Sequence, residues 1–524
     1  MAESTRMLLG LAIGIILMII LVSKTKVHTF IALLAAAMVT GLIGGMLPGD
    51  VTVDGVTKTG IITAIQNGFG NTLRSTGIII GLGVMMGGVL EKSGAAEKMA
   101  YSFIQAVGKK KEEWALAITG WFIAIPVFAD SAIVIFAPLY KAISKVTGKS
   151  LVGLALAMAA GLQLTHCLVP PTPGPTTAAS MLGVDVGQMI LMGAIISIPM
   201  LIVAVFYCMW IGKQIYQVPT NDGGFDRKEF KQEYIKSMEE LDKLIGEKQL
   251  PSLGWSIAPI VVPLVLILTN TIMGFVGTSG KSIMTLAVVI VAIGIISFIF
   301  KGITSGFSFV IFDIRILLVI IGIAFGASYY FVAGFVDIFI QVITLLGAPI
   351  VALSIGTLLA IYGLMGKADN KEVLKIMDDA IKDTGIIMLI TGAGGSLGNV
   401  ISVSGIGNAL GELVLSWPIP AVIIPFIIAA MMRIALGSAT VAITTAASLS
   451  APIAAQLGIS PILLALACCV GAISFSYFND SGFWVWNGMF GVSELKDQIR
   501  CKTAISMIMS CVGVVELIIL SFVL

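Results

Sequence analysis

The sequence predicts an all-α protein that crosses a membrane many times. Of its 524 residues, 57% are hydrophobic and 11% are charged, whereas an average soluble domain is about 45–50% apolar and about 25% charged. The mean hydropathy is +1.04. Apolar runs near the roughly 20 residues that a spanning helix requires recur along the chain. The formal net charge of +2 gives no reason to expect a nucleic-acid partner.

The apolar runs predict about 11 to 14 spans. The first is followed by Lys24 and Lys26 without a small-residue cleavage site, so we interpret it as a spanning helix rather than a cleaved signal. Two further runs, 129–145 and 434–456, are interrupted by Ser, Thr and Pro and are predicted as re-entrant hairpins. The candidate spans are 7–22, 27–47, 76–91, 114–128, 151–169, 187–211, 255–275, 282–300, 315–334, 349–365, 385–401, 419–432, 458–475 and 502–523.

One long segment, 213–254, is charged with mixed sign and is predicted to be a solvated cytoplasmic linker. The six cysteines lie in or beside apolar runs, which favours buried thiols over a disulfide framework. The predicted organisation is an N-terminal helix, a first membrane repeat, the linker, connecting helices and a second repeat, at 1–26, 27–212, 213–254, 255–314 and 315–524.

Matched motifs predict that the two membrane halves are related. Thr76-Gly-Ile-Ile79 recurs 308 residues later as Thr384-Gly-Ile-Ile387, and Gly174 and Gly482 share that offset. Loop 48–72 is nearly free of lysine, while loop 366–383 carries four. Because positive loops favour the cytoplasm, equivalent helices are expected to enter from opposite sides. Inverted repeats with broken helices are a recurring plan of secondary transporters.

The first predicted helix break is at 166–175, where prolines crowd against a glycine. A helix cannot continue through them, and a helix that restarts here would direct its positive end into the break. Thr172, Gly174 and Thr176 are therefore candidate substrate ligands, and His166 is a candidate for coupling.

The second predicted break is at 479–482. Asp480 is an acid in an apolar setting, which marks a functional candidate in a membrane protein. Its carboxylate could hold a coupling proton, coordinate a cation or accept hydrogen bonds from substrate hydroxyls. It could also cap the N-terminus of the next helix. Asn479 and Ser481 are candidate substrate ligands beside it.

The hairpin tips are predicted at Asp130-Ser131 and at 437–440. Ser131, Ser438 and Thr440 are candidate ligands for substrate, and Asp130 is a second candidate for coupling. Arg433 is expected to pair with a substrate carboxylate, with Asp130 or with Asp480.

Other motifs exclude function classes. The glycine-rich stretch 391–399 contains a formal G-x-S-x-G, but no His follows it, so close helix packing is favoured over a hydrolase site. The sequence contains no P-loop, so an ATP-driven pump is not expected. We predict no cofactor and no metal site. Asp337 and Glu516 also lie in apolar surroundings and are assigned no role.

At these motifs the chain resembles the gluconate permease (GntP) family of bacterial proton symporters. The resemblance rests on 166–175, 390–395, 433–442 and 479–484, which span most of the chain. It implies a multi-pass inner-membrane protein, commonly a homodimer, that moves its substrate by an elevator motion between paired hairpins. It also implies import of gluconate or a related sugar acid, or of D-serine or glycerate. Gluconate-type members often have His shortly before the Asn-Asp pair, where this chain has Tyr477.

Together these features predict a proton-coupled importer of a small hydroxylated carboxylate. A sodium-coupled symporter of the same fold is the first alternative, since backbone carbonyl oxygens exposed at the helix breaks could also coordinate Na⁺. An intramembrane enzyme, built on His166 near Thr165 and Thr172, and a passive channel are more remote alternatives.

Overall fold

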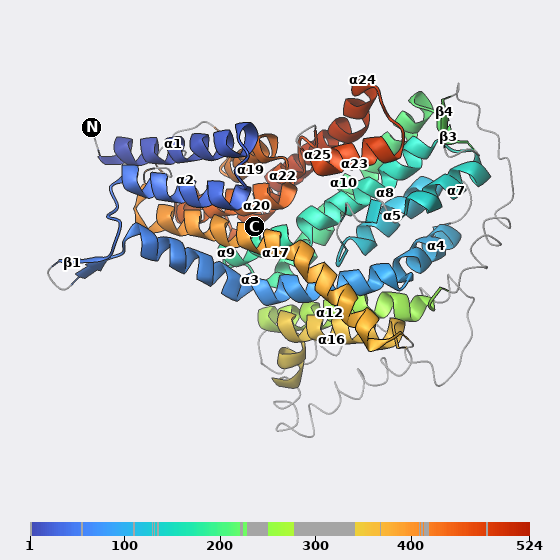
Figure 1. The fold of residues 1–524 in the computed structure, drawn as a ribbon, viewed down its shortest axis with the longest axis horizontal. Coiled ribbons are helices and arrows are strands. Elements are labelled where there is room, and N and C mark those ends of the chain that lie inside the picture. The colour runs from blue at the N-terminus through green and yellow to red at the C-terminus, as the bar shows by residue number, and fades with distance from the viewer. Residues whose placement is uncertain are drawn as a thin grey trace. The chain divides into compact units, whose positions relative to one another are not determined.

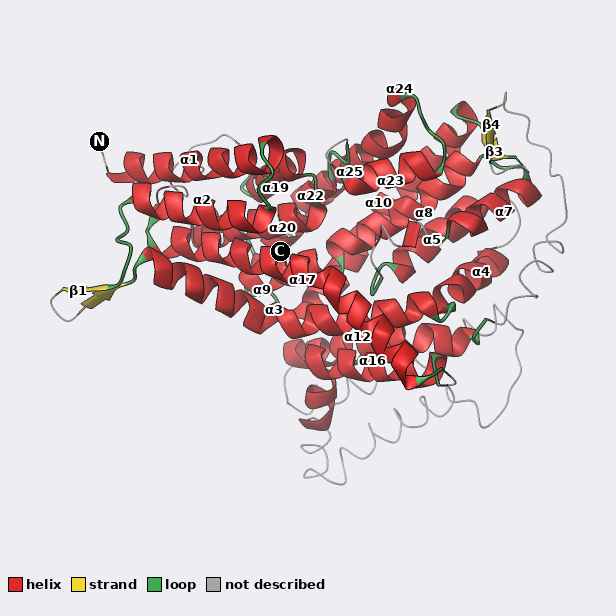
Figure 2. Cartoon of the chain, viewed as in Figure 1, coloured by secondary structure: helices red, strands yellow, loops and turns green. Residues whose placement is uncertain are grey.

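The computed structural model is almost entirely helical, with two short β-hairpins (Figure 2). It describes residues 3–53, 56–107, 111–127, 129, 132–133, 136–220, 224–227, 250–276, 341–366, 368–407, 409, 412, 419–477 and 480–523. The chain divides into two compact units, Met1–Ala258 with Thr357–Leu524, and Pro259–Gly356. The connecting-helix prediction for 277–314, and Asp337, lie outside the described residues. The partition predicted from the sequence stays a prediction.

The first half of the chain contains two N-terminal helices, a hairpin and the helices of the first predicted repeat (Figure 1). These elements are α1 (Glu3–Lys24), α2 (Thr29–Gly44), β1 (Val51–Val53), β2 (Val56–Lys58), α3 (Ile61–Lys92), α4 (Ala95–Val107), α5 (Glu112–Ile123), α7 (Ala137–Thr147), α8 (Leu151–Leu168), α9 (Pro173–Met181) and α10 (Val186–Gln214).

The remaining elements begin with a second hairpin and end with a long apolar helix. They are β3 (Gln217–Pro219), β4 (Phe225–Arg227), α12 (Leu253–Val276), α16 (Pro349–Leu364), α17 (Asn370–Val403), α19 (Ile423–Leu436), α20 (Ala439–Ser450), the 3₁₀ turn Ala451–Ile453, α21 (Ala454–Leu457), α22 (Pro461–Ile473), α23 (Ser481–Met489), α24 (Leu495–Gln498), the π-turn Ile499–Thr503 and α25 (Ala504–Leu520).

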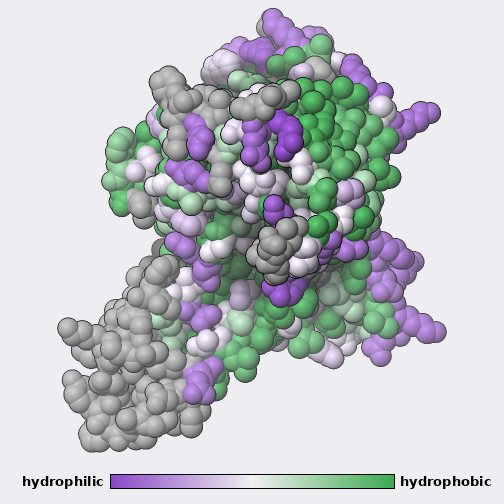
Figure 3. Space-filling view, turned by 90° about the vertical axis from the view of Figure 1, so that its left-hand side faces the viewer, coloured by the Kyte–Doolittle hydropathy of each residue, from purple (hydrophilic) through white to green (hydrophobic). Residues whose placement is uncertain are grey.

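Within the described ranges, seven helical segments are long and apolar enough to cross a membrane, and five shorter apolar helices accompany them. One face of the molecule shows broad hydrophobic areas at its surface (Figure 3). Large apolar side chains such as Ile31, Met38 and Leu42 of α2 are exposed, as they are in proteins whose surface meets lipid. The polytopic class is confirmed, and the number of spans stays a prediction.

Two segments that hydropathy left as loops are largely helical. Residues 61–72 belong to α3, and 370–383 belong to α17. The first turn of α17 is polar, and α3 has polar residues such as Gln66 and Asn67 in its second turn. Hydropathy detects an apolar run but not the amphipathic first part of the same helix. The predicted starts of these two helices therefore lie too close to the C-terminus.

Glycines allow α3 and α17 to cross at backbone contact. A Cβ at Gly68 would lie 2.4 Å from the carbonyl oxygen of Gly395. Ser396 Oγ donates to the carbonyl of Ile65 at 2.9 Å, and Asn399 Nδ2 donates to that of Ala64 at 2.7 Å. The glycine-rich stretch 391–399 is therefore a helix-packing surface, as its composition indicated.

The two predicted repeats contain the same order of elements. In the first, a left-handed Gly148 precedes α8, a break, α9, the left-handed Gly183 and α10. In the second, the left-handed Gly458 precedes α22, a break, α23, the left-handed Gly491 and the last helices. This order is what a duplication requires. The inverted relation of the repeats stays a prediction.

The start of the predicted linker folds onto the second half of the chain. Gln217 of β3 donates from Nε2 to the carbonyl oxygen of Phe490 at 2.5 Å. Arg227 of β4 pairs with Asp497 and, at 3.3 Å, with Glu494. Residues 228–249 of the predicted linker lie outside the described part of the chain. The described hairpin thus clamps the start of the predicted linker to the second half of the chain.

Candidate functional site

The second helix break is organised by one carboxylate. Asp480 is the N-cap of α23, and its Oδ1 accepts a hydrogen bond of 3.0 Å from the Gly482 amide. Its Oδ2 accepts from Ser476 Oγ at 2.6 Å and from Arg433 Nη2 at 2.5 Å. Asp480 is thus both the helix cap and the ionic partner that were alternative interpretations of its sequence position.

Arg433 connects this break to the tip of the second hairpin. It lies in the last turn of α19, and its Nη1 donates to the carbonyl oxygen of Gly437. Its side chain is only 4% exposed, and that of Asp480 is 13% exposed. Because a buried charge without a partner is costly, the ion pair holds the tip and the break together.

The tip itself presents free donors beside the guanidinium. Gly437 has a positive φ of 78°, which reverses the chain, and Ser438 caps α20 by accepting from the Val441 amide at 3.4 Å. The amides of Ala439 and Thr440, in the first turn of α20, are bonded to no described acceptor. A helix N-terminus with free amides stabilises an anion, so the predicted hairpin tip is suited to a carboxylate.

The first break provides fewer donors than its sequence predicts. The chain leaves α8 at Leu168, passes a cis Pro170–Pro171 bond, and restarts as α9 at Pro173. Among the first three residues of α9, only Gly174 has an amide hydrogen, because Pro173 and Pro175 have none. Thr172 Oγ1 is also engaged, donating to the Val169 carbonyl at 2.6 Å. The first break therefore has fewer free donors for an anion than the tip of α20.

The hairpin tip lies between both breaks. A Cβ at Gly174 would be 3.6 Å from the Cα of Thr440 and 2.7 Å from Ile443 Cδ1, so α9 meets the start of α20 there. Gln163 of α8 donates from Nε2 to the carbonyl oxygen of Ile473 at 3.1 Å, which joins α8 to the end of α22. Three of the four motifs selected from the sequence thus come together.

The structure describes most but not all of the predicted site residues. Thr172, Gly174 and Thr176 are buried at the first break, whereas Ser438 is exposed and Thr440 half-buried at the tip. His166 is half-buried in the last turn of α8. Glu516 is half-buried in α25. Asp130, Ser131, Asn479 and the side chain of Ser481 lie outside the described residues.

Three residues that support the second break were missed. Besides Gln163, Ser476 bonds Asp480, and Thr503 Oγ1 donates to the Ser476 carbonyl at 2.7 Å. The spacing of Ser476 and Asp480 was a usable signal, because both lie in one interruption of an apolar run. Gln163 and Thr503 lie in other segments, so their role depends on the tertiary structure.

Two solved structures show the same class of fold, that of a multi-pass membrane transporter. The first is Neisseria gonorrhoeae MtrF, whose structure is described as illuminating a class of antimetabolite efflux pumps, with a TM-score of 0.57 at 14% identity over 97% of both chains. The second is the Alcanivorax borkumensis YdaH transporter, with a TM-score of 0.52 at 13% identity over 93% of this chain and 95% of that one. At such identities the likeness concerns the fold alone.

The chain belongs to the GntP permease family, whose model matches residues 6–301 and 296–523. It is 40% identical to an uncharacterized permease of Haemophilus influenzae over 94% of this chain and 87% of that one. It is 29% identical to a gluconate permease of Pseudomonas aeruginosa over 100% and 99% of the two chains. An L-idonate transporter of Escherichia coli is also 29% identical, over 99% of both. The protein is accordingly a multi-pass permease of the bacterial inner membrane and not an enzyme.

Proposed function

We propose that the protein imports a small hydroxylated carboxylate, gluconate or a related sugar acid, by proton symport. Relatives of full length are named as transporters of gluconate and of L-idonate, both of which are polyhydroxylated carboxylates. The observation that carries the proposal is the Arg433–Asp480 ion pair, held at 2.5 Å beside the free amides of α20. A cation and helix amides together form a site for a carboxylate.

The same pair supplies a means of coupling. Asp480 and the substrate carboxylate are both partners for Arg433, so they compete for it. A proton on Asp480 removes its charge and releases Arg433, whereas an ionised Asp480 retains the guanidinium. Substrate therefore binds with a proton, which is the condition for symport.

The remaining candidates fit supporting roles in this scheme. The hydroxyls of Thr172, Thr176, Ser438 and Thr440 lie around the break and the tip and suit the hydroxyl groups of a sugar acid. His166 and Asp130 stay predictions for coupling, as do Asn479 and Ser481 for binding. The proposals of an elevator motion and of a homodimer rest on the resemblance to the family.

Sodium coupling has less support from the described breaks. Carbonyl oxygens would be the cation ligands, yet those of Val169, Ile473 and Ser476 accept hydrogen bonds from side chains. Na⁺ dependence of uptake is the direct measurement that separates the two couplings.

The test is uptake of labelled gluconate into proteoliposomes with an inward proton gradient and no Na⁺. Accumulation that collapses with a protonophore is expected, with glycerate and D-serine as competitors to define the substrate. Asp480→Asn should lose driven accumulation while retaining exchange of labelled for unlabelled substrate.

The matched control is Asp185→Asn. Asp185 caps α10 by accepting from the Gln188 amide at 2.9 Å, as Asp480 caps α23, but it lies at the start of α10, outside the second break. Full accumulation by Asp480→Asn would remove Asp480 from coupling. Uptake only after Na⁺ is added would replace the proton as the driving ion.

A further inference from the structure

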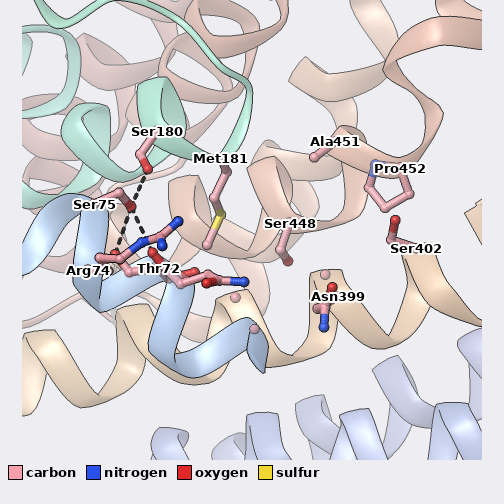
Figure 4. A pocket seen from close by; sticks show the side chains of 14 residues that line it. Thr72, Arg74, Ser75, Ser180, Met181, Asn399, Ser402, Ser448, Ala451 and Pro452 are labelled. Atoms are coloured by element: carbon pink, nitrogen blue, oxygen red, sulfur yellow. Dashed lines mark hydrogen bonds between the residues drawn. The ribbon is translucent and has the colours of Figure 1, made fainter. Parts of the chain in front are cut away.

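A polar cavity of about 520 Å³ lies among α3, α9, α17 and the end of α20. Its wall consists mainly of amide and hydroxyl side chains, with one arginine and no carboxylate (Figure 4). Ser180 Oγ donates to Ser75 Oγ at 2.5 Å and links α9 to α3 at its rim. The lining includes Asn71, Arg74, Ser180, Asn399, Ser402 and Ser448.

Arg74 gives this cavity its chemistry. Within the described part of the chain, its exposed side chain forms no ion pair or hydrogen bond, and no acid lines the cavity. A guanidinium selects planar anions such as carboxylates. Amides and hydroxyls select hydroxyl groups. The lining therefore matches an anion that carries several hydroxyls.

Two hydroxyl rows connect this cavity to the hairpin tip. On α20, Thr440, Thr444 and Ser448 follow at intervals of four residues, as Thr172, Thr176 and Ser180 do at α9. Residues four apart lie on one face of a helix, about 6 Å apart along its axis. Each row begins at the tip or the first break and ends at the cavity.

The middle members of both rows are buried without a partner. The hydroxyls of Thr176 and Thr444 are fully enclosed and bond no described group. A buried hydroxyl without a hydrogen bond is unfavourable. α9 packs directly against α20, so these unbonded hydroxyls lie along the α9–α20 contact, which is called the α9–α20 seam below. A polar solute in this seam would supply the hydrogen bonds that the two hydroxyls lack.

We propose that the cavity is a second binding subsite for a hydroxylated carboxylate, with Arg74 holding its carboxylate. The α9–α20 seam joins this subsite to the Arg433 site. The inference rests on the proposed function and adds to it a place where substrate is held before or after the central site.

The first test measures the initial rate of labelled gluconate uptake against concentration, in phosphatidylcholine liposomes. Arg74→Gln should raise KM by about tenfold, the value of one charge-assisted contact, with kcat within about twofold. Arg74→Lys should recover part of the loss, and Ser402→Phe, which fills the cavity, should also raise KM. Lys58→Gln removes a positive charge from β2, away from the cavity, and should leave KM unchanged.

The second test counts binding sites on the purified protein by equilibrium dialysis with labelled gluconate. Wild type should bind two molecules per chain, and Arg74→Gln and Arg433→Gln should each bind one. One site in wild type, or an unchanged KM in Arg74→Gln, would overturn the second subsite and leave the proposed function standing. No saturable uptake or binding of any sugar acid by wild type would overturn the proposed function itself.

An anionic lipid headgroup has similar chemistry, so the uptake series is repeated with phosphatidylglycerol added. An Arg74→Gln effect that appears only when that lipid is present would assign the cavity to a headgroup and overturn the substrate assignment. An effect of the same size in both membranes supports it.

Discussion

The side-chain amide of Gln163 is 3.1 Å from the carbonyl oxygen of Ile473, at the point where α22 ends. This contact joins the helix before the first break to the helix before the second. The carbonyl belongs to the buried end of α22, and its own helix supplies no donor for it beyond the break. This hydrogen bond is thus one of several contacts that join the two predicted repeats.

Gln163→Leu should lower the free energy of unfolding by about 1–3 kcal/mol, because it leaves a buried carbonyl without its donor. Thermal unfolding in detergent measures this change. Gln214→Leu, at the exposed end of α10, is the control and should have little effect. Equal melting temperatures for Gln163→Leu and wild type would show that the contact does not stabilise the fold.

Arg433→Met should destabilise the protein by about 3–5 kcal/mol, since it leaves the Asp480 carboxylate unpaired in a nearly buried position. The double variant Arg433→Met with Asp480→Asn removes both charges, so it should regain most of that stability without regaining transport. Thermal unfolding and gluconate uptake are measured on the same preparations. Transport by the double variant would contradict the binding role of Arg433.

Gly68→Ala should disrupt the crossing of α3 and α17. The new Cβ would lie 2.4 Å from the Gly395 carbonyl oxygen and 2.8 Å from the Cα of Ser396, and backbone atoms there have no room to move. Gly70→Ala, two residues away, would meet nothing within 4 Å and should stabilise α3 by about 0.5–1 kcal/mol through helix propensity. Folded yield and melting temperature distinguish them, and equal behaviour would contradict the close crossing.

Arg227→Gln should weaken the clamp between β4 and the start of α24, but only slightly. The Arg227 side chain is 46% exposed, and such pairs contribute about 0–1 kcal/mol and are screened by salt. The hydrogen bond with Asp497 raises the pKa of Arg227 above its ordinary value, so the contribution from Arg227 is present at every pH below that ordinary value and is lost as the pH rises through the raised pKa, in strong alkali. The loss in melting temperature should shrink between low and high salt, with Lys24→Gln as control; a salt-independent loss would indicate packing instead.

The positions of the helix breaks and of the second hairpin tip were predictable because they depend on local chemistry. Prolines at 170–175 interrupt a helix wherever it lies, and Gly437 with Ser438 provides a chain reversal and a cap. The glycine-rich face of α17 was predictable for the same reason. The N-terminal parts of α3 and α17 were not predictable, because polar side chains in them lower the local hydropathy by which a spanning helix is recognised.

The partners of these motifs required the tertiary structure. From the sequence Arg433 had three candidate partners, namely a substrate carboxylate, Asp130 and Asp480, and the fold places it against Asp480. The Arg74 cavity has no sequence signal, since its polar lining is spread over four helices, of which α9 and α20 contribute one polar residue each.

The Arg433–Asp480 pair has an electrical consequence. One positive and one negative charge sum to zero in the empty site. In the proposed loaded site, protonated Asp480 is neutral and Arg433 is balanced by the substrate anion, so the sum is again zero. Membrane voltage does about 2.3 kcal/mol of work on each elementary charge that crosses it, for each 100 mV. A site with a net charge of zero in both states moves no net charge, so the voltage does no work on it. Transport of one monocarboxylate with one proton is therefore electroneutral, driven by the difference in acidity across the membrane and insensitive to its voltage.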